Sequence, residues 1–214
     1  MSYKNKLSAE IFRDHHSLDP DSLSIDPLMA SISGIAKIIG EFDILDTSRF
    51  LDISNHATNH INMDDYFLDT EHLPADINVL LTDRRLTYEN QLLRGVAQVL
   101  PNESALGTRI AIVSTYKNEF VAATTDHEVG HALNLSHCDN EECTMSLYFE
   151  CENEGYGDIY CRKHTDQLHK NADRLRRTKA GKKISRRILF PRFYAQFPED
   201  PFFSKAITNR QDGD

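Results

Sequence analysis

The chain has 214 residues, of which 40% are hydrophobic and 27% charged, and its formal net charge is −9. This composition is typical of a soluble globular protein with one core, or with one core and an extension. A secretory signal is not expected, because the first 16 residues contain lysines without an apolar run behind them. A membrane span is not expected either, because three charged residues interrupt the most apolar stretch, residues 28–45. Four cysteines without an export signal favour a reducing compartment, so we expect a cytoplasmic protein in which clustered cysteines bind metal.

The first half of the chain predicts one helix followed by several short strands. Residues 28–39 place apolar side chains at helical spacing. Short apolar or β-branched runs predict strands at 76–82, 95–100 and 109–115. Residues 84–93 are ambiguous, and 101–107 form a predicted loop.

The second half predicts two helices and an aromatic tail. Residues 120–134 are the best helix candidate, and a basic helical pattern begins at Lys163 and ends near Arg187. Six of the 19 aromatic residues follow residue 189. We expect these last residues to dock on the body as an irregular segment, with a partner site as the alternative.

Charge is divided unevenly along the chain. Residues 1–160 hold 10 Lys and Arg against 27 Asp and Glu, whereas residues 161–214 hold 14 against 6. A basic tail on an acidic body can bind nucleic acid or a membrane surface, or it can dock on the acidic body of its own chain. Docking is the simpler interpretation, since it needs no partner.

Residues 127–131 read HEVGH, the H-E-x-x-H pattern of zinc hydrolases. On a helix, His127 and His131 lie one turn apart on the same face, where both imidazoles can reach one ion. Glu128 then lies close to a zinc-bound water without being a ligand, and can accept its proton and pass it to a leaving amine. The pentapeptide alone is equally compatible with an ordinary solvated helix face.

His137 extends this pattern. It follows His131 by six residues, which on a continued helix would turn it about 240° away from that ligand. It becomes a third ligand only if the helix stops and the chain turns back. Asn134 is suited to this turn, because asparagine tolerates the left-handed conformation that ends helices.

The sequence HEVGHALNLSHCDNEECTM at 127–145 resembles the zinc motif of the metzincin metallopeptidases, and among them the archaemetzincins. Asn134 replaces the usual glycine. The resemblance implies an α+β, metzincin-like fold with a small mixed sheet, a zinc-binding active-site helix and a short C-terminal subdomain. It implies that His127, His131 and His137 hold a catalytic zinc above the Met-turn residue Met145. The implied catalytic domain spans residues 1–170, with the strongest similarity over 76–167, and residues 171–214 form the basic extension.

A second zinc site is also implied. Archaemetzincins have two further cysteines after the methionine, and here Cys161 and His164 stand in their place, with histidine replacing the last cysteine. Together with Cys138 and Cys143 they would form a Cys3His structural site, which is chemically suited to zinc. Cys151 is an alternative ligand, and unpaired buried thiols are the interpretation without metal.

The resemblance reaches upstream through the predicted strands at 76–82, 95–100 and 109–115. By this resemblance, Arg109–Thr115 would be the edge strand of the sheet, to which an extended peptide could add.

The sequence therefore predicts a zinc metallopeptidase with two zinc ions, acting on a peptide or protein, with Glu128 as general base. A zinc-stabilised interaction module, whose basic tail binds nucleic acid or an acidic partner, is the alternative. The intact Glu128 argues against it, because a purely structural site does not need that residue.

Overall fold

A computed structural model describes residues 6–17, 23–40, 42–45, 49–51, 60–63, 73, 75–100, 108–146, 160–179 and 192–196. The helices are α1 (Asp26–Ile39), α2 (Val121–Ala132) and α3 (Arg162–Lys179). A large sheet contains β1 (Leu7–Asp14), β2 (Phe42–Ile44), β3 (Arg49–Leu51), β5 (Ile77–Thr82), β8 (Gly95–Leu100), β9 (Thr108–Ser114) and β10 (Arg192–Gln196). A small sheet contains β4 (His60–Asn62), β6 (Arg85–Tyr88) and β7 (Gln91–Leu93).

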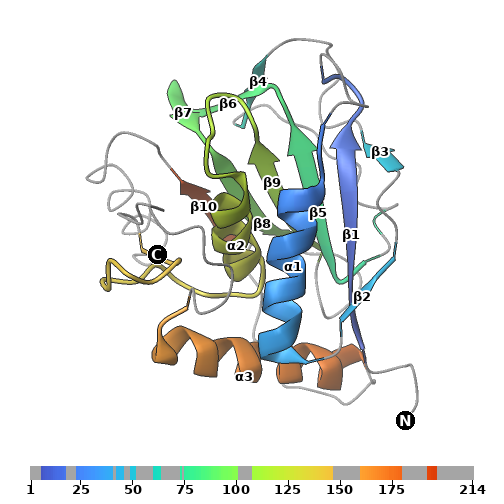
Figure 1. Ribbon diagram of the computed structural model, residues 1–214, viewed down its shortest axis with the longest axis vertical. Helices are drawn as coiled ribbons and strands as arrows, with labels where there is room; N and C mark the ends of the chain where they lie inside the picture. Colours follow the sequence, from blue (N-terminus) through green and yellow to red (C-terminus); the bar gives the residue numbers. More distant parts are fainter. Residues whose placement is uncertain are drawn as a thin grey trace.

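The large sheet is mixed and has the order β10-β8-β9-β5-β1-β2, with β3 also paired to β1 (Figure 1). Strands β1, β5 and β9 run parallel, whereas β8 is antiparallel to β9 and β10 is antiparallel to β8. Strands β5 and β9 are buried along their whole length, as expected for central strands covered on both faces. The α+β class and the mixed sheet are thus confirmed.

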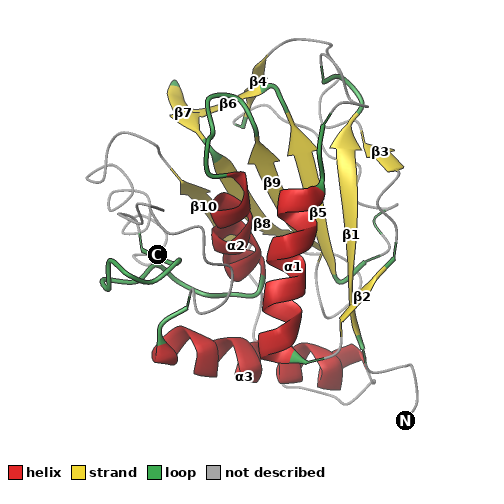
Figure 2. Ribbon diagram, in the orientation of Figure 1, coloured by secondary structure: helices red, strands yellow, loops and turns green. Residues whose placement is uncertain are grey.

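Three layers enclose two hydrophobic clusters. Helices α1 and α2 lie side by side on one face of the large sheet (Figure 2). Alternate residues of the central strands face them and form the larger cluster, which includes Ile11, Val79 and Val113. Phe12 and Leu80 point the other way and pack with residues of the small sheet.

A tight hairpin resolves the ambiguous residues 84–93. Strands β6 and β7 are joined by Glu89 and Asn90, whose φ angles are 47° and 65°. Two consecutive positive φ angles are the mark of a type I′ turn, which matches the twist of a hairpin. Polar residues fill most of this hairpin, so the sequence shows little of the alternation between apolar and polar residues that indicates a strand.

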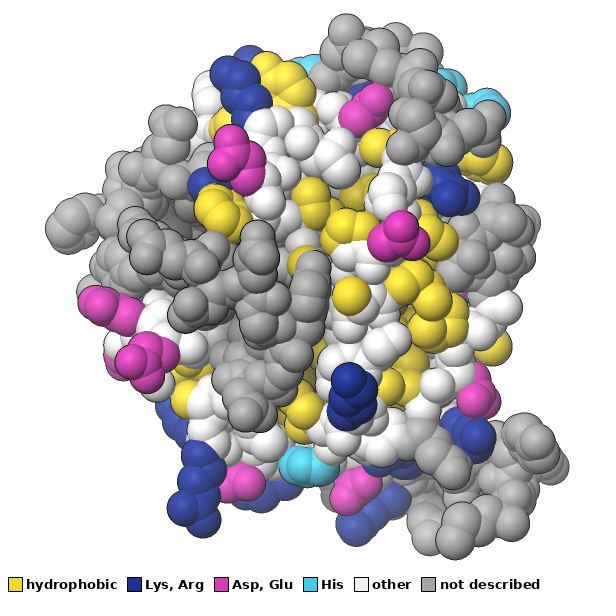
Figure 3. All heavy atoms as spheres, viewed as in Figure 1, with side chains coloured by type: hydrophobic (Ala, Val, Ile, Leu, Met, Phe, Trp, Pro, Cys, Tyr) yellow, Lys and Arg dark blue, Asp and Glu magenta, His cyan; other side chains and the backbone are white. Residues whose placement is uncertain are grey.

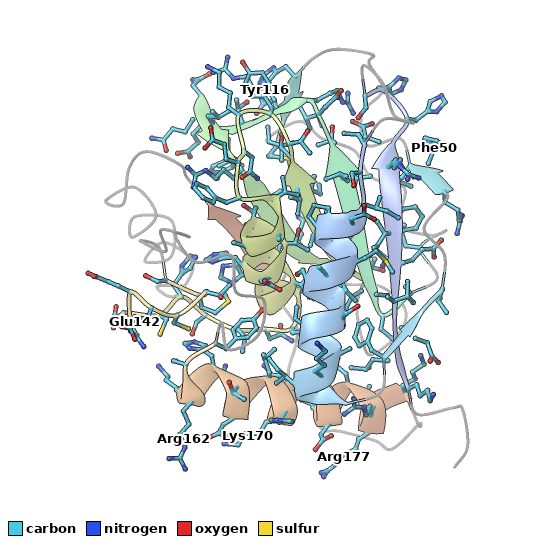
Figure 4. The ribbon with its side chains drawn as sticks, viewed as in Figure 1. Phe50, Tyr116, Glu142, Arg162, Lys170 and Arg177 are labelled. Carbon is cyan, nitrogen blue, oxygen red and sulfur yellow. The ribbon has the colours of Figure 1, made fainter. Side chains whose placement is uncertain are left out.

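Helix α3 packs against the end of α1 and against β1. Its buried residues recur at helical spacing: His164, Leu168, Ala172 and Leu175. Its basic residues lie on the other side, so that charged groups gather along the lower margin of Figure 3, and the labelled Arg162, Lys170 and Arg177 point away from the body in Figure 4. No helix in the described part of the chain has the length and apolar character that a membrane crossing requires.

Most predicted elements are confirmed, with boundaries shifted by one or two residues. These are the helices now seen as α1 and α2 and the strands now seen as β5, β8 and β9. The predicted basic helix is confirmed as α3 up to Lys179, and the predicted loop at 101–107 lies outside the described residues.

One prediction about the sheet is wrong. Arg109–Thr115 does not form an edge strand, because β9 lies between β8 and β5. Within the aromatic tail, residues 192–196 form the regular strand β10 instead of an irregular segment. Strand β1 was not predicted at all.

Candidate functional site

Helix α2 is buried over most of its length although its sequence is polar. Every residue from Thr124 to Ala132 is buried, and the helix packs against β8, β9 and α1. The side chains of His127, Glu128 and His131 are each at most 1% exposed. This rules out an ordinary solvated helix face, because such a face leaves its polar groups in water.

Asn134 ends the helix in the left-handed conformation, with a φ angle of 63°. The N–H of Leu135 donates to the carbonyl of Gly130 at 2.9 Å, and the N–H of Asn134 donates to the carbonyl of His131 at 2.8 Å. This pair of hydrogen bonds is the Schellman motif, which reverses the chain after a helix. The predicted turn at Asn134 is confirmed, and it directs His137 back towards the helix.

Three imidazole rings converge beyond this turn. The Nε2 atom of His131 lies 2.9 Å from Nε2 of His127 and 3.1 Å from Nε2 of His137. Ligands of a tetrahedral zinc ion with Zn–N distances of about 2.0–2.1 Å stand roughly 3.3 Å apart. The cluster therefore has about the dimensions of a three-histidine zinc site.

The opposite ring nitrogens bind backbone carbonyls. Nδ1 of His127 donates to the carbonyl of Thr144 at 2.6 Å, and Nδ1 of His131 donates to the carbonyl of Leu135 at 2.8 Å. Because a carbonyl can only accept, these bonds put the proton on Nδ1 and leave a lone pair on each Nε2. Burial lowers the pKa of His127 to about 4 and that of His137 to about 3, which keeps both rings neutral. Converging lone pairs repel one another unless a cation lies between them, so these donors fit a metal ion.

Glu128 has a carboxyl group with no hydrogen-bond partner among the described residues. Both of its oxygens are buried. Burial raises the pKa of this carboxyl well above its ordinary value. A buried polar group without a partner costs free energy, so the carboxyl is suited to accept a hydrogen bond from a bound molecule such as water.

Gly95, the first residue of β8, makes room for this carboxyl. A Cβ atom at Gly95 would lie 2.8 Å from Cγ of Glu128 and 3.0 Å from its Oε1. Real Cβ atoms essentially never approach so closely. The sheet and the helix can thus meet at this distance only because residue 95 is glycine.

Met145 packs beneath α2 at Gly130. Its side chain is fully buried, and a Cβ atom at Gly130 would lie 2.5 Å from its sulfur. The N–H of Cys138 donates to the carbonyl of Met145 at 2.8 Å, so the loop after the helix folds back onto itself here. The thioether therefore lies against the helix that carries the histidines.

A second cluster brings together Cys138, Cys143, Cys161 and His164. The sulfurs of Cys138 and Cys161 are 3.8 Å apart, and Nδ1 of His164 lies 3.6 Å from the sulfur of Cys143 and 3.1 Å from that of Cys161. With Zn–S distances of about 2.3 Å, a tetrahedral site has roughly 3.8 Å between sulfurs and roughly 3.5 Å between sulfur and nitrogen. The three cysteines are free thiols. All four donors thus fit one zinc ion.

The two clusters share a short stretch of backbone. Cys138 directly follows His137, and Cys143 directly precedes Thr144, whose carbonyl binds His127. The hydroxyl of Tyr160, next to Cys161, donates to the carbonyl of Asp126 at 2.6 Å. A displacement of the cysteine cluster would therefore move groups that position the histidines.

The fold that carries these two clusters is similar to that of several solved structures. No protein-family profile matches the sequence, and neither does any curated protein. Archaemetzincin from Methanopyrus kandleri aligns with a TM-score of 0.54 at 17% identity, over 80% of this chain and 98% of that one. A zinc-dependent peptidase from Methanocorpusculum labreanum aligns with a TM-score of 0.46 at 18% identity, over 75% and 99%. Archaemetzincin from Archaeoglobus fulgidus, complexed with malonate, aligns with a TM-score of 0.45 at 17% identity, over 75% and 99%.

The chain has an archaemetzincin-like fold. Asn134 and His164, the two positions singled out in the sequence, both contribute to the local geometry. Asn134 adopts the left-handed conformation, and His164 presents Nδ1 to the same cluster as the cysteines. Neither substitution removes a donor from the two clusters.

Some residues that shape this site were not identified from the sequence. Gly95 and Gly130 were not predicted as site residues, nor was Leu135, whose carbonyl binds His131. Gly130 did offer a signal, since glycine inside a helix costs about 1 kcal/mol relative to alanine and indicates a close contact. Cys151, the alternative ligand, lies outside the described residues.

Proposed function

We propose that this protein is a zinc-dependent peptidase with Glu128 as its general base. One observation carries the proposal: a buried carboxyl without a partner adjoins His127, in a cluster of three imidazoles whose lone pairs converge. A purely structural metal site needs the imidazoles but not the carboxyl. The archaemetzincin-like fold supports the same function.

Two zinc ions belong to the proposal. His127, His131 and His137 would hold the catalytic ion, and the cluster of Cys138, Cys143, Cys161 and His164 the structural one. When bound, the catalytic ion supplies a Lewis acid that lowers the pKa of water to about 7 and polarises a carbonyl group. Burial raises the pKa of the Cys143 thiol to about 12, so its thiolate would form only in the presence of a cation.

The chain's own residues then have distinct roles. Glu128 accepts a proton at a carboxylate oxygen as water attacks the peptide carbonyl, and returns that proton to the leaving amine. The carbonyls of Thr144 and Leu135 fix the orientation of two imidazole rings. Met145 provides an apolar support beneath the helix and does not bind the ion. The substrate class is a peptide or protein.

The interaction module remains the second candidate, and one observation favours it. Helix α3 exposes Arg162, Lys163, Lys170, Arg174 and Arg177 on the surface away from the body. Such a basic face can bind an acidic partner or nucleic acid. A salt-dependent shift on DNA or RNA, together with failure to cleave any peptide, would favour this function.

Substitution of Glu128 by glutamine tests the proposal. The Glu128→Gln variant keeps the size of the side chain but cannot accept the proton, so hydrolysis should fall by about 10²- to 10⁴-fold while zinc content stays unchanged. Cleavage of a proteome-derived peptide library can be followed by mass spectrometry, with zinc counted by native mass spectrometry. Glu142→Gln, at an exposed glutamate on the loop that carries Cys138 and Cys143, is the matched control and should behave as wild type. Undiminished hydrolysis in Glu128→Gln would refute the mechanism.

A further inference from the structure

Beyond α3 the structure describes one segment, the strand β10. It pairs with β8 in antiparallel register, from Arg192 opposite Val99 to Gln196 opposite Gly95. Figure 1 shows the two strands side by side at one end of the large sheet. Because β9 already binds the other side of β8, β10 occupies the remaining edge of that strand.

This edge leads to the proposed catalytic carboxyl. Gly95 lies against Glu128, at the distance that excludes a Cβ atom, and it is the residue that pairs with Gln196. Helix α2 packs on β8 and β9, whereas the opposite end of the sheet is formed by β2 and β3 beside β1. A strand laid along β8 therefore runs up to Glu128, and one laid along β2 or β3 does not.

An extended peptide that binds through its backbone needs a strand edge with unpaired N–H and C=O groups. Beside Glu128 that edge belongs to β8, and β10 takes up its hydrogen bonds. We propose that β10 occupies the place of an extended peptide substrate, so that the C-terminal segment is an intramolecular competitor of substrate binding. This inference rests on the proposed peptidase function.

The length of β10 suits an exchangeable strand. It has five residues, and in the sequence Pro191 and Pro198 stand on either side of it. Proline cannot donate to a sheet ladder, so a longer pairing is disfavoured. A tethered strand of this size competes through its high local concentration, and a peptide can displace it without unfolding the body.

Proline substitution within β10 tests the inference in the full chain. In an antiparallel ladder, alternate residues direct their N–H groups to the partner strand. The pair Tyr194→Pro and Ala195→Pro must therefore remove one such donor, whichever residue supplies it. The matched control is Lys205→Pro with Ala206→Pro, which places the same change in the tail beyond β10.

The first measurement is binding of a fluorescent synthetic peptide with the sequence of residues 190–198. All variants carry Glu128→Gln, so that the peptide is not cleaved. The β10 variant should bind this peptide about tenfold more tightly than the chain with unaltered β10. This is the change expected if the tail occupies the edge of β8 in roughly nine molecules of ten, because only the remaining molecules can bind the peptide. The control should match unaltered β10, and equal affinity in all three chains would overturn the inference.

The second measurement is hydrolysis, with Glu128 intact. The KM of the β10 variant should fall by about tenfold at constant kcat, since the tail competes with substrate and takes no part in the reaction. Tighter peptide binding without hydrolysis in any chain would leave strand exchange standing and refute the peptidase function. Hydrolysis with an unchanged KM would refute the competitor and leave the peptidase function standing.

A crosslink gives an independent test if the proline variant does not fold. Arg192 and Val99 are directly paired, so Arg192→Cys with Val99→Cys can form a disulfide that locks β10 on β8. The oxidised chain should not bind the peptide, and reduction should restore binding to the wild-type value. Peptide binding to the locked chain would overturn the inference.

Discussion

Gly95 and Glu128 meet where helix α2 packs against the sheet. The contact makes β8 part of the site, although β8 carries no residue of either metal cluster. The side chain of Glu128 is held in place by packing, because no described residue offers it a hydrogen bond. Its orientation therefore depends on the absence of a side chain at residue 95.

We expect Gly95→Ala to lower kcat by at least about tenfold while leaving both zinc ions bound. The added methyl group would meet Cγ of Glu128 and Cγ2 of Thr124 at 2.8 Å each, so the carboxyl must shift. Overpacking of this kind also costs about 1–3 kcal/mol of stability. Steady-state kinetics, zinc counting and denaturant unfolding measure the three quantities.

Gly34→Ala is the matched control. A Cβ atom at Gly34, in the middle of α1, meets nothing within 4 Å. Alanine there should leave kcat unchanged and raise stability by about 1 kcal/mol, because glycine is a poor helix former. If Gly95→Ala has the wild-type kcat, the position of the Glu128 carboxyl does not limit the rate of hydrolysis.

Individual site residues differ in how far the sequence reveals them. His127, His131 and His137 follow from spacing and from the turn at Asn134, since helix geometry fixes which side chains share a face. Gly95 leaves no such pattern, because its function depends on a side chain 33 positions later in the chain that packs against it. A glycine that allows a helix and a sheet to pack closely cannot be distinguished in the sequence from any other glycine.

At the scale of elements, the loop after α2 and the start of α3 act as one unit. The loop supplies Cys138 and Cys143, and α3 supplies His164 from its first turn. Further along α3, the side-chain amide of Asn171 donates to the carbonyl of Leu133 at 2.7 Å, at the end of α2. Helix α3 thus contributes to the cysteine cluster and also contacts the C-terminus of α2.

Cys143→Ser should reduce zinc from two ions per chain to one and weaken binding of the remaining ion. Serine is a poor zinc ligand, and loss of the structural ion frees the segment whose Thr144 carbonyl orients His127. Loss of an outer partner of this kind typically lowers metal affinity by about 10- to 100-fold. Native mass spectrometry counts the ions, and chelator competition gives the affinity.

Cys151→Ser is the corresponding control and should leave two ions. A single ion in wild type, unaffected by Cys143→Ser, would exclude the structural site. A loss of zinc in Cys151→Ser but not in Cys143→Ser would assign the ligand role to Cys151.

Elements with one apolar face or a continuous apolar run were predicted, whereas strand β1 and the three-residue strands β2, β3 and β4 were missed. Helix α1 and strand β5 have such patterns. Strand β1 has the sequence LSAEIFRD, and its buried polar residues have specific partners. Glu10 pairs with Arg49 at 2.9 Å, and Asp14 accepts a hydrogen bond from Thr82 at 2.7 Å. Partners so distant in the sequence cannot be recognised from local periodicity.

At the scale of the whole molecule, a buried ion pair between described residues joins the large sheet to the segment that leads into the small one. Asp14 ends β1, and Arg84 stands between β5 and β6; neither side chain is exposed. Nη2 of Arg84 donates to Oδ1 of Asp14 at 3.0 Å and Nε donates to Oδ2 at 2.5 Å. The backbone carbonyl of Arg84 also accepts a hydrogen bond from the hydroxyl of Ser114 at 2.7 Å.

We expect Asp14→Asn to lower the free energy of unfolding by about 3–5 kcal/mol, because it leaves a buried guanidinium without its counter-charge. Denaturant unfolding of the zinc-loaded protein measures this change. The control is Asp173→Asn, which removes the exposed pair with Arg176. Its cost should stay below about 1 kcal/mol, since surface pairs contribute little. If the two variants lose the same free energy of unfolding, the buried pair stabilises the fold no more than the exposed pair does.

The place of β1 inside the large sheet has a consequence for synthesis on the ribosome. Strand β1 leaves the exit tunnel before the other described helices and strands, yet its partner along one side, β5, begins 63 residues after β1 ends. Strands β2 and β3 can pair with one side of β1 early, but the other side of β1 stays unpaired until β5 has been translated. During this interval, chaperones that bind short extended segments can bind β1. Its residues are synthesised early but are buried in the core only after β5 has been made.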